Sequence, residues 1–241
     1  MQDIYILPMS RAEQLRSFHS GEQKTEAAQD VVFKWLKQHI LTLPRHDGVF
    51  LTEAEVSRAT GTSRTPVREA MLRLEADGLL QIVPKKGAYV PPVTDADIVA
   101  VIQARALVED WCVRRATRFG DALAAELDRL IEEQAKHQDD PIVFIESDRQ
   151  FHRAIVGAAA NPLLAGFYES LRDRQLRMGV HVITTSGQRI GEVLAEHRAI
   201  AASLRSGDPE AAAAAVAQHL ATTLAALHMP PTAPWGRSSF S

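Results

Sequence analysis

The sequence contains a single cysteine and no long apolar run. Cys112 alone cannot form an internal disulfide, so a disulfide framework is excluded and a reducing compartment is expected. No stretch approaches the roughly 18 consecutive apolar residues of a membrane-spanning helix. The first residues also lack the basic region and apolar core of a secretory signal. We therefore expect a cytoplasmic protein without a membrane partner.

A strong charge of either sign is also lacking. The formal net charge is -3, and residues 45–93 carry seven Lys or Arg against six Asp or Glu. A DNA-binding domain is expected to present a basic face, so charge alone gives little support for nucleic-acid binding. Hydrophobic and charged contents of 46% and 24% are typical of a globular protein, and 241 residues are enough for one large domain or two ordinary ones.

The distribution of proline and of apolar periodicity predicts a mainly α-helical, two-domain chain. Pro91-Pro92 indicates a linker, because proline fixes φ and removes a donor. Before the linker, short helical patterns end in alternating segments, and after it a helical period dominates up to about residue 228. We predict a flexible extension over 1–23, a first domain over 24–92, an all-α six-helix antiparallel bundle over 93–228 and a disordered tail over 229–241.

Helix start and stop signals give the expected helices of the second domain. Thr94 is a candidate N-cap, Pro141, Pro162 and Pro209 suit early helical positions, and Asn161 is interpreted as an N-cap. The expected helices run over residues 94–119, 121–138, 141–159, 162–180, 188–206 and 209–227.

Residues 51–90 predict a helix-turn-helix followed by a two-stranded wing. Thr52 and Glu55 have the spacing of a capping box that opens a short helix, and Gly61 suits the turn after it. Ser63 is expected to cap the second helix. One face of that helix is expected to be buried, because its apolar residues follow helical spacing: Val67, Ala70, Met71 and Leu74. The two strands of the wing are expected over residues 79–83 and 88–90.

The exposed side of the second helix carries candidate DNA contacts. Arg64 and Arg68 are i, i+4 neighbours, with Thr65 beside them, at the end that a recognition helix presents to base edges. Lys85 and Lys86 lie at the hairpin tip, where they could approach phosphates. The same basic residues could equally form an ordinary solvated face, so the pattern alone leaves both interpretations open.

The segment SRTPVREAMLRLEADGLL, followed by a Lys/Gly-rich wing, resembles the GntR family of bacterial regulators. The resemblance implies a three-helix winged domain whose first helix covers about residues 25–41. It also implies that Ser63, Arg64, Thr65, Arg68 and Gly87 contact DNA. Some members have an arginine where this chain has Ala54, and Arg45 or Arg58 could only partly substitute, so the operator preference stays open.

Asp148 and three histidines form a second constellation, in the helical domain. Asp148 and His152 share one helix face, and His197 and His219 lie on apolar faces of two further helices. Each histidine alone is more often a hydrogen-bonded core residue. Burial of an aspartate without compensation costs several kcal/mol, and a divalent cation would offset that cost. The set therefore favours a metal site assembled from inward-facing helix residues.

The motifs SDRQFH, AANPLL, EH at 196–197 and the late His219 resemble the FCD domain, the ligand-sensing domain of the FadR-like branch of the GntR family. This resemblance implies that Asp148, His152, His197 and His219 bind a divalent metal. Zinc is the common ion, with manganese or nickel as alternatives.

Arg105 lies at an inward position of the first sensing helix. It could form an i, i+4 ion pair with Glu109, or its guanidinium could meet a carboxylate ligand. The resemblance favours the second interpretation, because this branch often senses small organic or sugar acids.

The sequence therefore predicts a homodimeric DNA-binding repressor that a small carboxylate or sugar acid modulates, and not an enzyme. Two alternatives remain: a metal-free dimeric DNA-binding scaffold and a metallohydrolase. A hydrolase would need a general base, and Glu196 points about 100° away from its neighbour His197.

Overall fold

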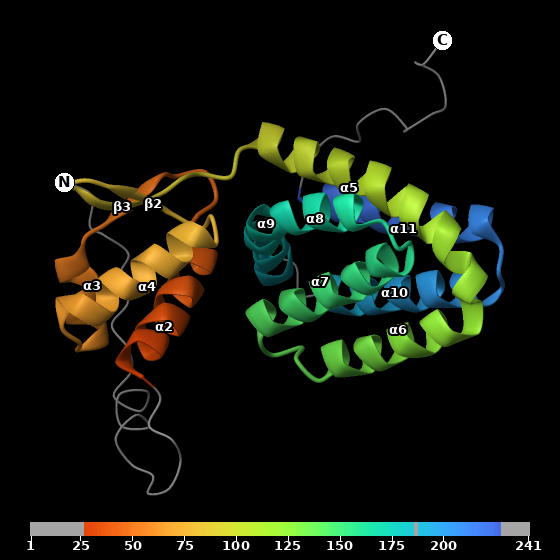
Figure 1. Ribbon diagram of the computed structural model, residues 1–241, viewed down its shortest axis with the longest axis horizontal. Coiled ribbons are helices and arrows are strands. Elements are labelled where there is room, and N and C mark those ends of the chain that lie inside the picture. The colour runs from red at the N-terminus through yellow and green to blue at the C-terminus, as the bar shows by residue number, and fades with distance from the viewer. Residues whose placement is uncertain (1–26, 186–187, 228–241) are drawn as a thin grey trace, which may run out of the picture. The chain divides into compact units, whose positions relative to one another are not determined.

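The structure, a computed structural model, describes residues 27–185 and 188–227 (Figure 1). Contacts separate the chain into two compact units, with the division between Pro92 and Val93. The predicted extension over 1–23 and tail over 229–241 lie outside the described residues. Within the described ranges, no helix has both the length and the apolar character needed to cross a membrane.

The first unit is a winged helix-turn-helix. Its helices are α2 (Ala28–Thr42), α3 (Glu53–Thr60) and α4 (Arg64–Ala76), and its strands are β1 (Val49–Leu51), β2 (Gln81–Val83) and β3 (Gly87–Val90). Helix α2 packs on α4, and Val32, Leu36 and Ile40 of α2 are buried together with Val67 and Leu74 of α4. The predicted fold class is confirmed for this unit.

Local signals position α3 and α4. Thr52 and Glu55 form the predicted capping box, and Gly61 ends α3 in the left-handed region at φ 68°. The predicted face of Val67, Ala70, Met71 and Leu74 is buried. Ser63 occupies the N-cap position of α4, but its side chain forms no capping hydrogen bond, so the predicted side-chain cap is wrong.

The wing is a three-stranded antiparallel sheet with strand order β1-β3-β2. Phe50 of β1 pairs with Tyr89, and Ile82 of β2 pairs with Ala88. The sequence predicted β2 and β3 but missed β1. Three residues are too few to show the alternation of a strand, and β1 gains its partner only when β3 returns to it.

The second unit is a helical bundle. Its elements are α5 (Asp95–Ala116), the short 3₁₀ helix η1 (Thr117–Phe119), α6 (Gly120–Ala135), α7 (Pro141–Ala158), α8 (Pro162–Ser170), α9 (Arg172–Thr185), α10 (Arg189–Arg205) and α11 (Pro209–Ala226). Pairwise contacts close a ring in the order α5, α11, α10, α6, α7 and back to α5, and α9 packs against α7 and α5. Figure 1 shows α6, α7 and α10 running beside one another. The predicted helical bundle is confirmed.

Capping side chains begin most of these helices where the sequence predicts. Thr94 forms a capping box with Asp97, and Asp140, Asn161 and Asp208 each accept backbone N–H bonds just before a proline in the first turn. The helix expected over 162–180 is divided into α8 and α9. The amide of Leu171 bonds to the carbonyl of Tyr168, three residues back, so the turn tightens without a glycine or proline that the sequence could reveal.

Candidate nucleic-acid interface and metal centre

The basic residues predicted to contact DNA gather around one hollow of the first unit. Arg64 and Arg68 at the start of α4 line this hollow, whose volume is about 500 Å³, together with Lys85, Lys86 and Gly87 of the wing. The four basic side chains belong to exposed residues. Helix α4 and the wing therefore present their cations to the same space, although the unit as a whole carries little net charge.

Ser63 and Thr65 are exposed but are not among the residues that line the hollow. Their backbone lies at the first turn of α4, where N–H groups have no intrahelical partner and attract anions.

Glu53 shares the hollow, and sequence reasoning missed its role. Its two carboxylate oxygens accept hydrogen bonds from Nε and Nη2 of Arg68 at 2.8 and 2.9 Å. This bidentate bond lowers the pKa of Glu53, with the charges of Arg68 and Arg64 adding to it. The guanidinium of Arg68 is thereby held in one orientation on the surface.

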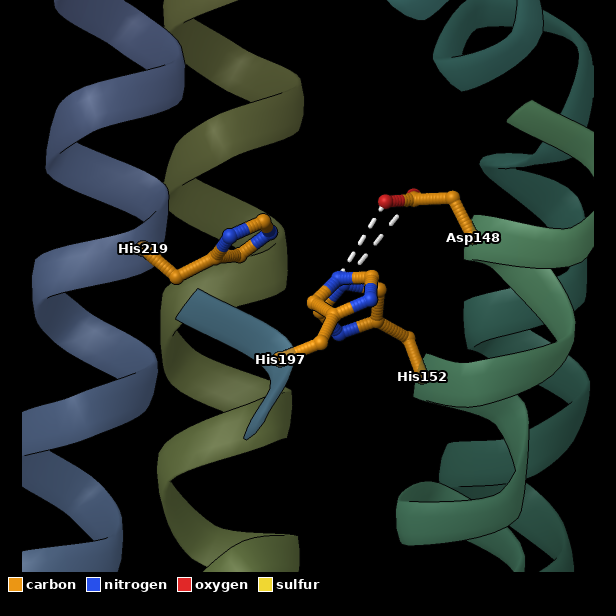
Figure 2. A group of neighbouring side chains, drawn as sticks. All are labelled: Asp148, His152, His197 and His219. Atoms are coloured by element: carbon orange, nitrogen blue, oxygen red, sulfur yellow. Dashed lines mark ion pairs between the residues drawn. The ribbon is translucent and has the colours of Figure 1, made fainter. Parts of the chain in front are cut away.

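Asp148, His152, His197 and His219 converge in the bundle, as Figure 2 shows. Asp148 and His152 project from α7, His197 from α10 and His219 from α11. One ligand atom of each residue can be chosen so that all lie within 4.8 Å of one another. The structure therefore brings all four predicted metal ligands together.

Burial and charge at this cluster fit a cation. The histidine side chains are at most 2% exposed, and Nε2 of His152 and of His197 has no hydrogen-bond partner in the described part of the chain. Nε2 of His197 nevertheless lies 3.3 Å from Oδ1 of Asp148, without hydrogen-bond alignment. Converging lone pairs beside a carboxylate repel one another unless a cation lies between them.

The pKa shifts of His197, His219 and Asp148 favour two neutral imidazoles and an ionised carboxylate. Burial lowers the pKa of His197 to about 3, with the other histidines opposing its protonation and Asp148 favouring it. Burial likewise lowers the pKa of His219. Burial raises the pKa of Asp148, but the close contact with His197 and the other nearby imidazoles outweigh burial and hold that pKa well below its usual range. These are the protonation states that a metal ion requires of its ligands.

A small cavity adjoins the cluster. Its volume is about 40 Å³, and its polar lining includes Arg105, Asp148, Arg189 and His219. Arg105 forms the i, i+4 pair with Glu109, with Nε 2.7 Å from Oε1 in a buried environment. Its Nη2 atom is buried without a hydrogen-bond partner among the described residues. Both interpretations of Arg105 thus have support, because one nitrogen is paired and another remains available.

Family models match both units. Residues 28–90 match the model described as bacterial regulatory proteins, gntR family, and residues 100–222 match the FCD domain. The chain belongs to the GntR family. The resemblance that the sequence motifs carried, including the FCD domain, is confirmed.

Two relatives of the chain are named as transcriptional repressors. The chain is 31% identical to the probable D-xylose utilization operon transcriptional repressor of Paenarthrobacter nicotinovorans, over 74% of this chain and 79% of that protein. It is 26% identical to the galactonate operon transcriptional repressor of Escherichia coli K12, over 71% and 83%. The solved structure of E. coli McbR/YncC is 25% identical, with a TM-score of 0.62 over 84% of this chain and 97% of that one.

Membership of the GntR family makes the chain a DNA-binding transcription regulator and not an enzyme. The bundle agrees with this conclusion, because Glu196 is not free to act as a general base. Its carboxylate is held by Arg189 at 2.7 and 2.8 Å and by Nδ1 of His219 at 2.7 Å.

The sequence analysis missed the contacts that several residues make with the Asp/His cluster. Glu109 and Gln134 contact ligand histidines from other helices. Phe151 stacks on the ring of His197, with centroids 4.0 Å apart and an interplanar angle of 5°. Phe151 lies between Asp148 and His152 in the SDRQFH motif. This position was the signal in the sequence that could have indicated its contact with the cluster.

Proposed function

We propose that this GntR-family protein is a repressor whose operator binding is modulated by a small carboxylate bound beside a divalent metal in the helical bundle. The assignment gives residues 24–92 to DNA binding and residues 93–228 to sensing. One observation carries it: Arg105, a buried cation whose Nη2 has no hydrogen-bond partner among the described residues, lines the same cavity as Asp148 and His219.

The chain's own residues would bind the effector in two ways. Nη2 of Arg105 can donate to a carboxylate oxygen, while apolar side chains of the cavity keep water from competing. The ligand atoms of Asp148, His152, His197 and His219 fit a borderline divalent ion, with zinc proposed and manganese or nickel as alternatives. When bound, such an ion would supply Lewis-acid attraction for a second effector oxygen beside these four side chains.

The cavity size favours a short acid. One water-sized group needs roughly 10–15 Å³ of such space, so the cavity of about 40 Å³ admits a group of only a few heavy atoms. The names of the two repressors above refer to D-xylose utilization and galactonate operons, so sugar acids belong in the same panel as short carboxylates.

On the DNA side, two protomers would place two copies of α4 on a near-palindromic operator. Ser63, Arg64, Thr65 and Arg68 would read or flank base edges, while Lys85, Lys86 and the backbone of Gly87 would contact phosphates. The common hollow of α4 and the wing supports this arrangement.

The effector site is tested with the operator, first obtained by selection from randomised duplexes. Arg105→Lys keeps a cation beside Glu109 but shortens the donor that reaches the cavity. We expect this variant to bind operator normally and to lose the response to the acid that releases the unchanged protein. Arg153→Lys is the matched control, because Arg153 lies on α7, pairs with Glu169 and is absent from the cavity lining. An undiminished response in Arg105→Lys would reject the site.

The metal ligands are tested by elemental analysis of purified protein. His152→Ala and His197→Ala should each remove the metal. His137→Ala should retain it, because His137 contacts Glu133 and lies outside the cluster. Full metal content in the first two variants would show that the ligands are wrong. Operator affinity unaffected by chelator and by every acid would instead favour a metal-free DNA-binding scaffold.

A further inference from the structure

Each histidine of the metal cluster has an acceptor side chain at its other ring nitrogen. Nδ1 of His152 lies 2.8 Å from Oε2 of Glu109, Nδ1 of His197 lies 2.9 Å from Oε1 of Gln134, and Nδ1 of His219 lies 2.7 Å from Oε2 of Glu196. The three acceptors come from α5, α6 and α10. The first contact is close, but its geometry is not that of a hydrogen bond, unlike the other two.

The acceptor at His152 is a carboxylate that other donors hold in place. Oε1 of Glu109 accepts from Nε of Arg105 and from the hydroxyl of Tyr168, each at 2.7 Å. Burial raises the pKa of Tyr168 well above its usual value, so the hydroxyl keeps the proton that it donates. Both donors occupy the same oxygen, and Oε2 is left for the imidazole.

The orientation of Gln134 is fixed by a carbonyl. Its Nε2 donates to the carbonyl oxygen of Phe144 at 3.3 Å, and this oxygen can only accept. The amide therefore presents Oε1 to His197, and Nδ1 of His197 must carry the hydrogen.

Glu196, the acceptor at His219, is held by an arginine, as Glu109 is. Arg189 donates through Nη1 and Nη2 to the two oxygens of Glu196, and Nη2 also contacts Oγ1 of Thr223. Arg189 is 1% exposed, so this bidentate pair is shielded from competing water. Arg189 and Arg105 both line the cavity. Each donates to a glutamate carboxylate that also contacts a histidine of the cluster.

We propose that Glu109, Gln134 and Glu196 are the positioning residues of the metal centre, each accepting Nδ1–H so that all three neutral imidazoles present an Nε2 lone pair to one point. The inference rests on the proposed metal site but concerns residues outside its ligand set. Partners of this kind fix the ring orientation and raise the basicity of the ligand nitrogen.

The tautomers are measured directly in the full-length protein after chelator treatment, with ¹⁵N- and ¹³C-labelled histidine. Signals are assigned by loss in His152→Gln, His197→Gln and His219→Gln. We expect all three rings as Nδ1–H tautomers. In Gln134→Met, His197 should change to the Nε2–H form, because Asp148 is then its remaining acceptor at 3.3 Å. An Nε2–H ring at any of the three positions in the unchanged protein would overturn the proposal.

Metal affinity gives the second measurement, by competition between the protein and a chromogenic zinc chelator. Glu109→Gln, Gln134→Met and Glu196→Gln should each weaken zinc binding about 10- to 100-fold, as loss of such partners does at other metal sites. Asp110→Asn is the matched control, since Asp110 follows Glu109 on α5 but pairs with Arg114, outside the cluster. Circular dichroism confirms that each variant is folded.

The outcomes separate the two proposals. If the unchanged protein binds no zinc, manganese or nickel, the proposed metal function fails. The tautomers then still show whether Glu109, Gln134 and Glu196 orient the three imidazoles. If the unchanged protein binds zinc and the three variants bind it equally well, the positioning role fails while the metal site stands.

Discussion

Glu53 places a negative charge among the cations that line the hollow of α4 and the wing. It holds Arg68 through two hydrogen bonds, and the Arg68 side chain is 66% exposed. An exposed pair of this kind contributes little to the free energy of unfolding. Its consequence is orientational, because a guanidinium fixed in one plane matches the edge of a base better than a mobile one.

Glu53→Gln should reduce the discrimination between operator and unrelated DNA by up to about fivefold, the range of an exposed ion pair. Release of Arg68 weakens the specific contact, and loss of the negative charge strengthens attraction to any phosphate backbone. The ratio of the two dissociation constants, measured by fluorescence anisotropy at one salt concentration, checks this. Glu69→Gln on the exposed side of α4 is the control. A ratio that rises or stays constant contradicts the orienting role.

Gly87 is required by its close approach to the backbone as well as by its φ of 114°. A Cβ at this position would overlap the carbonyl oxygen of Leu51 in β1, closer than van der Waals contact allows. Gly87→Ala should therefore destabilise the wing by more than the roughly 1–2 kcal/mol of a left-handed alanine. Denaturant unfolding checks this against Gly61→Ala, which has φ 68° but no atom within 4 Å of the added Cβ. Equal losses would contradict the steric argument.

At the residue scale, sequence reasoning found the groups that carry distinctive chemistry and missed their partners. The SDRQFH motif and the spacing of the later histidines indicated Asp148, His152, His197 and His219, which the structure brings together. Glu109 and Gln134 are common residue types on amphipathic helices, with no motif of their own. Their contacts arise only because the ring of helices places α5 and α6 beside the cluster, and one-dimensional spacing does not contain that information.

At the scale of elements, helix starts were predictable because a cap is a local interaction. Asn161 illustrates this, since its Oδ1 accepts from the amides of Leu163 and Leu164 at 3.1 and 3.3 Å. The break between α8 and α9 and the strand β1 were not predictable from the sequence. The first is a tightened turn without glycine or proline, and the second is three residues long and depends on pairing with β3.

Asn161→Ala should lower the free energy of unfolding by about 1 kcal/mol, because two N–H groups at the start of α8 lose their acceptor. Its metal content and its response to the acid should be unchanged, since Asn161 is absent from both the cluster and the cavity lining. Denaturant midpoints and elemental analysis measure the two effects. Asn161→Asp is the control and should retain the cap. A loss of acid response in Asn161→Ala would identify Asn161 as a ligand contact.

At the scale of the whole molecule, the two units use charge in different ways. The first unit exposes its cations around one hollow, whereas the second buries Arg105 and Arg189, each 6% or less exposed, behind carboxylates. Removal of one partner from a buried ion pair leaves an uncompensated charge, which typically lowers the free energy of unfolding by about 3–5 kcal/mol. The second unit therefore depends on its buried polar contacts for stability, and we expect a bound metal ion to stabilise this unit selectively.

Removal of the metal should loosen the bundle and leave the first unit unchanged. A ligand present at 100 times its dissociation constant stabilises the folded state by about 2.7 kcal/mol, which corresponds to roughly 100-fold slower exchange of amides that open with the site. Chelation should therefore accelerate amide exchange in α7, α10 and α11, which carry the four ligands, but not in α4. Hydrogen-exchange mass spectrometry resolves these helices. His197→Ala is the control and should exchange fast with or without zinc. If α4 responds to chelator as strongly as α10, or if α10 does not respond, the metal does not stabilise the bundle through these ligands.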